Sequence, residues 1–335
     1  MKACRFPSSG GPIARKTTPA VTALVSAVVA VTLALLPVAE SRAQAVTPVK
    51  TPLRVAYVPV ITWLISWIAK DRGFFDLHGL DVTLSPIQNL SLLPPTMGRQ
   101  FDIAASTAPD LLKAAASGID VVGVAGETIE LTANQSMQVI VRPDSGIRSV
   151  QDLKGKVVAT PTIGAVMHVA TLHWLRAGGV DPNSIRAIEV PFPNMGDQLK
   201  AGRVDALELL QPFVGQQLAA GNVSIGNPLL SVADPGLFTF WIAQGAWARA
   251  NPAVLERWIA ALKDARQFLE TNPTESRSIL AKYTRLPDAV AQRIPFPTYD
   301  TTLNASQLEV WAKVLRDLGQ LNAPVDTSRL VVTPR

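Results

Sequence analysis

The 335-residue chain has few of the side chains that enzymes use as nucleophiles or metal ligands. It contains one cysteine, Cys4, and three histidines, His78, His168 and His173. His168 and His173 stand five positions apart, a spacing that does not put both on one face of a helix, so no metal-binding pair is predicted. The sequence also lacks an HExxH, a GxSxG, a P-loop and a GxGxxG motif. We therefore predict no catalytic residues, no metal and no cofactor.

Apart from its N-terminus, the chain has no long apolar run. Residues 1–45 begin with basic side chains, continue through an uncharged apolar segment from Val21 to Val38, and end in Ala43-Gln44-Ala45. This is the pattern of an export signal, with cleavage predicted after Ala45. Because Cys4 precedes the apolar run, the processed chain would contain neither a thiol nor a disulfide.

The excess of positive charge also belongs to this leader. The whole chain has 31 Lys+Arg and 26 Asp+Glu, and the leader holds five of the first and one of the second, which leaves 26 against 25. A processed protein this close to neutrality gives no electrostatic reason to bind nucleic acid. We predict a periplasmic protein without a nucleic-acid partner.

Alternating helical and extended segments predict an α/β fold. Leu53–Val58 is an apolar run that ends at Pro59, as a buried strand would. Three segments end in Gly98, Gly118 and Gly202, each followed by a short β-prone run with an aspartate near its start. Helix, glycine cap and strand in repetition favour parallel-rich sheets covered by helices. Beyond Asn251 the pattern is helical, over 251–271, 273–284, 287–293 and 304–319.

Two polar breaks divide this α/β chain. They lie at Arg142–Gly146 and Ser231–Gly236, and the segment between them has strands and helices of its own. The chain enters this segment once and leaves it once, which predicts that the segment forms a lobe of its own. We assign residues 46–141 and 235–335 to the first lobe and residues 142–234 to the second.

The segment from Gly146 to Gly179 has the clearest local pattern. It reads as a strand from about Val157, a polar loop from Thr160 to Gly164, and a helix from about Ala165. Free backbone N–H groups and the positive end of the helix dipole gather at such a junction. The junction suits a small anion, although it is equally an ordinary connection in a parallel sheet.

Polar and aromatic side chains follow the predicted strands, where ligands of open α/β sheets bind. The only clear charges in these loops are Asp110 and Glu208, and no lysine or arginine falls among them. Hydroxyls and amides can instead be helix caps, Trp63 can be core, and His168 can simply pack. The candidate ligand-binding residues are Thr62, Trp63, Asn89, Ser91, Ser106, Thr107, Thr160, Thr162, Gly164, His168, Phe192, Asn194, Glu208 and Gln211.

Several stretches resemble one family of transport proteins. They are LRVAYVP, IAKDRGFFDLHGLDVTL, FDIAAST, SGIRSVQDLKGKVVATPTIGAVMHVATLHWLRAGGVD and LKAGRVDALELLQPF, together with the ending LGQLNAPVDTSRLV. They are similar to the substrate-binding proteins of ABC importers, in the branch that serves nitrate, taurine, aliphatic sulfonates and thiamine-pyrimidine precursors. The resemblance implies a type II-like two-lobe fold with a two-stranded hinge, a ligand in the cleft, and closure on binding.

The same resemblance implies a monomer that delivers a small molecule to an ABC permease at the inner membrane. Two alternatives stay open: an enzyme like the eukaryotic thiamine-pyrimidine synthases, which use a cysteine-rich motif, and an exported ligand-sensing domain. The ligand is left open among sulfonate, carboxylate, nitrate and pyrimidine. Helix N-termini with neutral donors favour an anion, whereas Glu208, if it faced the cleft, would favour a cation or a ring N–H.

Overall fold

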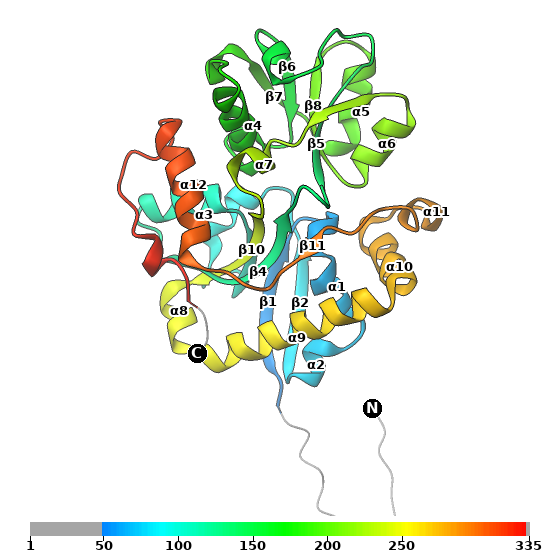
Figure 1. The fold of residues 1–335 in the computed structure, drawn as a ribbon. Coiled ribbons are helices and arrows are strands. Elements are labelled where there is room, and N and C mark those ends of the chain that lie inside the picture. The colour runs from blue at the N-terminus through cyan, green and yellow to red at the C-terminus, as the bar shows by residue number, and fades with distance from the viewer. Residues whose placement is uncertain (1–48, 333–335) are drawn as a thin grey trace, which may run out of the picture. The chain divides into compact units, whose positions relative to one another are not determined.

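The structure of the chain is a computed structural model that describes residues 49–332. The predicted leader and its cleavage after Ala45 lie outside these residues. Within them the chain forms two β-sheets, each with helices on both faces (Figure 1). The two-lobe α/β fold predicted from the sequence is confirmed.

The first sheet has six strands in the order β11-β4-β10-β3-β1-β2. Strands β1, β2 and β3 run parallel to one another, and β10 enters antiparallel between β3 and β4. Its strands are β1 (Thr51–Tyr57), β2 (Leu80–Pro86), β3 (Ile103–Ser106), β4 (Val121–Glu130), β10 (Gly236–Gln244) and β11 (Thr298–Tyr299).

The second sheet has five strands in the order β7-β6-β8-β5-β9. Strands β6, β7 and β8 are parallel, whereas β5 pairs antiparallel with β8 and β9. Both sheets are therefore mixed, because β10 in the first sheet and β5 in the second run against the parallel set. Its strands are β5 (Met137–Val141), β6 (Val157–Thr160), β7 (Arg186–Glu189), β8 (Ala206–Leu210) and β9 (Val223–Gly226).

Helices cover the first sheet on two sides. One core packs Trp63, Trp67, Trp241 and Trp258 beneath α1 (Leu64–Asp71) and α9 (Pro252–Thr271). A second core lies under α3 (Ala108–Ala116) and α12 (Ala305–Asp317). The remaining helices of this lobe are α2 (Phe74–Leu77), α8 (Gly245–Ala250), α10 (Pro273–Thr284) and α11 (Asp288–Ala291). The helical tail predicted after Asn251 is confirmed, with its third helix reduced to α11.

The second sheet is covered in the same way. Helix α4 (Val166–Ala177) packs Leu175 against β5, β6 and β8 on one face. The opposite face is covered by α5 (Phe192–Lys200) and α6 (Phe213–Ala219). The predicted strand, loop and helix of the Val157–Ala177 region are confirmed within one residue at the helix start. Helix α4 also contributes Val166 and Met167 to the core beneath α3, so the lobes share apolar contact.

The chain crosses between the sheets twice. It leaves β4 at Glu130 and enters β5 at Met137; it returns from β9 at Gly226 through α7 (Leu229–Val232) to β10 at Gly236. The sequence assigned residues up to Val141 to the first lobe. Strand β5 nevertheless belongs to the second sheet, because its backbone pairs with β8 and β9 along its whole length.

No helix within residues 49–332 is long and apolar enough to cross a membrane.

Candidate functional site

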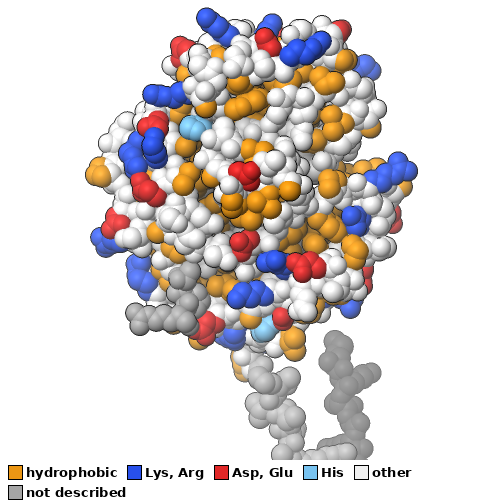
Figure 2. Space-filling view, in the orientation of Figure 1, with side chains coloured by type: hydrophobic (Ala, Val, Ile, Leu, Met, Phe, Trp, Pro, Cys, Tyr) orange, Lys and Arg blue, Asp and Glu red, His pale blue; other side chains and the backbone are white. Residues whose placement is uncertain are grey.

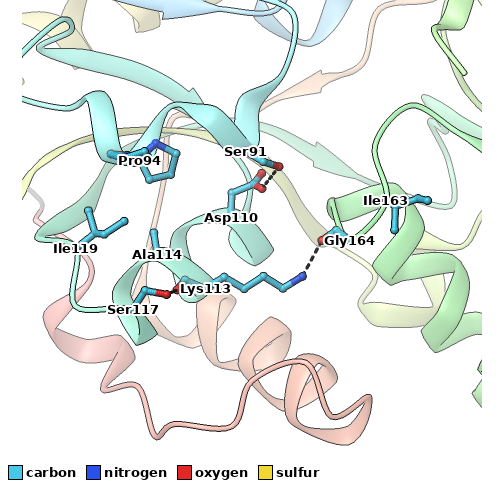
Figure 3. Close-up of a pocket in the computed structure, with 10 residues that line it drawn as sticks. Ser91, Pro94, Asp110, Lys113, Ala114, Ser117, Ile119, Ile163 and Gly164 are labelled. Atoms are coloured by element: carbon cyan, nitrogen blue, oxygen red, sulfur yellow. Dashed lines mark hydrogen bonds between the residues drawn. The ribbon is translucent and has the colours of Figure 1, made fainter. Parts of the chain in front are cut away.

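A pocket of about 370 Å³ lies where helix α3 of the first lobe meets the loop before α4 of the second. Figure 3 shows Lys113 reaching across it from α3 toward Gly164. The wall combines hydroxyls, two charged side chains and apolar groups. It is made of Ser91, Pro94, Pro95, Asp110, Lys113, Ala114, Ser117, Ile119, Ile163 and Gly164.

Asp110 stands in the first turn of α3 and is almost completely buried. Its carboxylate accepts one hydrogen bond from Ser91 Oγ and one from Thr107 Oγ1, both at 2.6 Å. Burial raises the pKa of Asp110, and these two hydrogen bonds oppose the rise. Asn89 holds the other end of this cluster, because its side chain accepts from the Ser91 N–H at 2.9 Å.

The loop before α4 is held by the chain's own side chains. The Ile163 N–H donates to Glu189 Oε1 at 2.8 Å, and the Gly164 N–H donates to His168 Nδ1 at 3.0 Å. Gly164 has a φ of +80°, a backbone conformation that glycine adopts without a Cβ penalty. Two N–H groups that the sequence predicted would hold an anion are therefore already hydrogen-bonded.

Lys113 joins the two lobes across the pocket. Its Nζ donates to the carbonyl oxygen of Gly164 at 2.8 Å and to Gln320 Oε1 at 3.0 Å. Burial lowers the pKa of Lys113, and the nearby charge of Asp110 opposes that fall. Lys113 lies within a helix, so the pattern of polar residues in the strand-end loops does not indicate it. The sequence nevertheless contains one indication of its place: Lys113 stands three positions after Asp110, in the segment that ends at Gly118.

His168 is buried one turn into α4. Burial and then the charge of Lys113 lower its pKa to about 4, with Glu189 acting in the opposite direction. The imidazole is therefore neutral at pH 7, as its acceptance of the Gly164 N–H through Nδ1 requires. The residue shapes the loop and does not line the pocket.

Glu208 lies away from the pocket, although the sequence placed it with the ligand-binding set. It is fully buried on β8, the strand next to β6. Within residues 49–332, hydrogen-bond partners are lacking for both of its carboxyl oxygens and for the hydroxyls of Thr160 and Thr171. Burial raises the pKa of Glu208 to about 7; the Thr160 and Thr171 hydroxyls are close enough to act against the rise, although neither lies in hydrogen-bond geometry with the carboxyl.

Thr62 and Trp63 are buried in the first lobe. They lie on a short 3-10 turn, Ile61–Trp63, and neither is exposed to solvent. The Trp63 ring packs edge-on against Trp241 with 4.7 Å between centroids. Trp241 Nε1 in turn donates to Glu127 at 2.6 Å. These residues do not line the pocket.

The other predicted site residues are scattered. Ser106 is buried at the end of β3, Thr162 is partly exposed in the loop before α4, and Asn194 is exposed on α5. Phe192 stacks on Phe213 with 5.5 Å between ring centroids, and Gln211 accepts a hydrogen bond from the Gly215 N–H. The pocket wall thus includes Ser91 and Gly164 from the predicted set; Asn89, Thr107 and His168 bond directly to wall residues.

The part of the chain that the structure describes contains no group of three or more His, Cys, Asp or Glu side chains able to hold a metal ion.

The comparison with known proteins follows from this architecture. Two mixed sheets joined by two crossings, with a pocket walled by both lobes, define the class of fold found in periplasmic binding proteins. The chain belongs to the family described as NMT1/THI5 like, which matches residues 63–276.

Two solved structures share the fold. The periplasmic aliphatic sulphonate binding protein SsuA of Escherichia coli aligns with a TM-score of 0.71 and 20% identity, over 85% of this chain and 92% of that one. The periplasmic nitrate-binding protein NrtA of Synechocystis PCC 6803 aligns with a TM-score of 0.69 and 16% identity, over 84% of this chain and 85% of that one.

Two relatives are similar over shorter stretches. A Brachyspira hyodysenteriae protein, provisionally named an ABC transporter periplasmic binding protein, is 38% identical over 87 residues, or 22% of this chain. A Haemophilus influenzae protein, provisionally named a thiamine biosynthesis protein, is 28% identical over 142 residues, or 42% of this chain. The matches span 25% and 43% of those two proteins.

Proposed function

We propose that the chain is an extracytoplasmic solute-binding protein that captures a small organic molecule between its lobes and delivers it to an ABC importer permease. The observation that carries this proposal is the pocket, whose wall is built from both lobes and bridged by Lys113. A site made by two lobes is completed only when they approach, so its occupancy reports closure. Its size suits a small solute rather than a macromolecule.

The relatives support the same proposal. The two structural neighbours bind aliphatic sulphonate and nitrate, and the Brachyspira protein carries the name of an ABC periplasmic binding protein. Export through the predicted signal, with cleavage after Ala45, would place the protein in the periplasm. Figure 2 shows acidic and basic side chains interspersed on the visible face. A face without a continuous basic patch agrees with the proposal that nucleic acid is not a partner.

We further propose that the protein acts as a monomer and without turnover. The similarity to a protein named for thiamine biosynthesis is the reason to weigh an enzyme as the alternative. The only cysteine of the chain lies in the predicted leader, so a processed protein could not use thiol chemistry. A sensing role shares the same pocket and differs only in the partner, which an interaction assay with the cognate permease would identify.

The two crossings are the proposed hinge. They span residues 131–136 and 227–235, between the two sheets. The sequence indicated polar breaks at Arg142–Gly146 and Ser231–Gly236. We move the first one earlier because β5 is fixed in the second sheet. Rotation about short irregular connections leaves both sheets intact, as hinge closure requires.

A thermal-shift screen followed by solution scattering tests the proposed function. A ligand that binds only the folded protein at a hundredfold excess over Kd stabilises it by about 2.7 kcal/mol. For a chain of this size, that corresponds to a rise in Tm of about 5 °C. Sulfonates, aromatic carboxylates, nitrate and pyrimidines form the screen, and a true ligand should also reduce the radius of gyration. Absence of binding in all four classes would refute the proposed ligand class, and stabilisation without compaction would refute lobe closure.

A further inference from the structure

We propose that Lys113 is the residue through which the inter-lobe pocket recognises an acidic group on its solute, and that its ammonium links this recognition to lobe closure. The inference rests on the proposed solute-binding function and names a specificity residue for it. The polar groups around the pocket differ in how many of their hydrogen bonds are already made within the chain.

The N–H groups of the two loop residues that line the pocket before α4 are not free. The unpaired N–H groups of the first turn of α4, from Val166 to His168, belong to residues outside the pocket wall. Glu189 accepts from the Ile163 N–H, and His168 accepts from the Gly164 N–H. The Ala165 N–H turns back to the carbonyl oxygen of Thr162 at 3.3 Å. An acidic solute group therefore needs a donor from elsewhere in the wall.

Lys113 is the cationic side chain of that wall. An ammonium has three N–H donors. Two of them bond to neutral acceptors, the Gly164 carbonyl and the Gln320 amide oxygen, and within residues 49–332 there is no third bond and no ion pair to Nζ. A partly buried cation held only by neutral acceptors gains more from an anionic partner than an exposed cation does.

The carboxyl of Asp110 does not serve as that partner. Its oxygens accept hydrogen bonds from Ser91 and Thr107, and burial raises its pKa, which weakens it as an anion. Asp110 lies one turn earlier on α3 and influences Lys113 through space rather than through a direct contact. The wall thus combines one available ammonium with hydroxyls and apolar surface, a set of groups that fits an organic acid.

The link to closure follows from the bond to Gly164. Lys113 belongs to the first lobe and the Gly164 carbonyl to the loop that opens α4 in the second. An acid bound by the third N–H lies against the same ammonium that holds the two lobes together. Separation of the lobes would then expose the ion pair to water and weaken it.

Matched acids and amides test this inference on the full processed chain. The probes are benzenesulfonate against benzenesulfonamide and benzoate against benzamide, measured by calorimetry on the wild type, Lys113→Met and Lys113→Arg. We expect the wild type and Lys113→Arg to prefer the acid, and Lys113→Met to lose at least about tenfold more affinity for the acid than for the amide. Lys200→Met, at the exposed end of α5, is the matched control and should behave as the wild type.

The outcomes separate this inference from the proposed function. If the wild type binds a probe and Lys113→Met keeps the same preference for acid over amide, the inference is wrong and the solute-binding function stands. The same holds if only the amides bind. If the wild type binds neither these probes nor any compound of the wider screen, both are contradicted. Should Lys113→Met fail to fold, Lys113→Gln replaces it in the same comparison.

Discussion

Glu130 and Glu208 are buried glutamates, one in each sheet, and they differ in the hydrogen bonds that they accept. Glu130 ends β4 and is 1% exposed, and Glu208 lies in β8 and is 0% exposed. Glu130 accepts four hydrogen bonds, from the N–H and Oγ of Ser136, the Met137 N–H and Asn227 Nδ2. Among the described residues, Glu208 accepts none.

The difference shows what each carboxyl does. Ser136 and Asn227 stand on the two separate crossings between the sheets, so the Glu130 carboxylate ties both connections together. Glu208 is instead enclosed inside one lobe without a basic side chain beside it, and the nearby Thr160 and Thr171 hydroxyls lie outside hydrogen-bond geometry with its carboxyl. Burial raises the pKa of both groups, but hydrogen bonds from Ser136, Met137 and Asn227 act against the rise in Glu130. The Glu130 carboxylate is therefore the joint between the two crossings. The Glu208 carboxyl instead holds its proton more tightly than an exposed glutamate does.

The largest effect should come from removing the joint. Glu130→Ala would leave the Ser136, Met137 and Asn227 donors buried without an acceptor, and we expect a loss of about 3 kcal/mol or more in the free energy of unfolding. Urea denaturation of the ligand-free protein measures it. Glu130→Gln keeps the side-chain shape and one acceptor oxygen, so it should lose less. A loss below about 1 kcal/mol in the alanine variant would remove Glu130 from its structural role.

The second effect is a pH dependence carried by Glu208. Its pKa of about 7 in the folded protein lies above the ordinary value of 4.5, so the folded state binds the proton more tightly than the unfolded chain does. The resulting stabilisation is complete below the ordinary pKa and is lost as the pH rises through about 7. Glu208→Gln has no carboxyl to titrate, so it lacks this pH-dependent stabilisation. The difference in the free energy of unfolding between wild type and variant should therefore change by up to about 3 kcal/mol between pH 4 and pH 9.

Denaturation of both proteins across that pH range checks the Glu208 prediction. Other buried acids with raised pKa values, such as Glu127, contribute equally to both curves and cancel in the difference. Parallel curves for wild type and Glu208→Gln would show that the carboxyl titrates normally, and a wild type that gains stability above pH 7 relative to the variant would reverse the sign.

The smallest effect should come from the exposed contact between the same crossings. Thr132 Oγ1 donates to Asp234 Oδ2 at 2.5 Å, and both residues are exposed. Water competes for such groups, so Thr132→Val should cost no more than about 1 kcal/mol. Asp234→Asn is the companion variant, since it keeps an acceptor oxygen. A Thr132→Val loss as large as that of Glu130→Ala would mean that the exposed contact, and not the buried joint, holds the crossings.

Local pattern predicted much of the fold. The apolar run before Pro59 became β1, and the strand, loop and helix around Thr160 became β6 and α4. The helical pattern expected from residue 304 became α12, which Asn304 caps by accepting a hydrogen bond from the Gln307 N–H. Such features depend on a few neighbouring residues, and a linear pattern carries that information.

The candidate site was predicted only in part. Of the candidate ligand-binding residues, Ser91 and Gly164 line the pocket, and their contact with a ligand stays a prediction. Glu208 and Trp63 went into cores, because the register of a strand or the packing of a turn decides which way such a side chain points. The role of Lys113 could not be read from local pattern, because its bond to Gly164 joins residues 51 positions apart.

The α/β class, the two lobes and the family resemblance could be inferred from the amino-acid sequence, because periodicity, glycine caps and motif spacing are local properties. The directions of β5 and β10, which run against their parallel neighbours, could not. Nor could the hydrogen bonds that Glu130 accepts and Glu208 lacks. Whether a buried charge finds donors depends on which distant segments the topology brings beside it, and that placement follows from the packing of the whole chain.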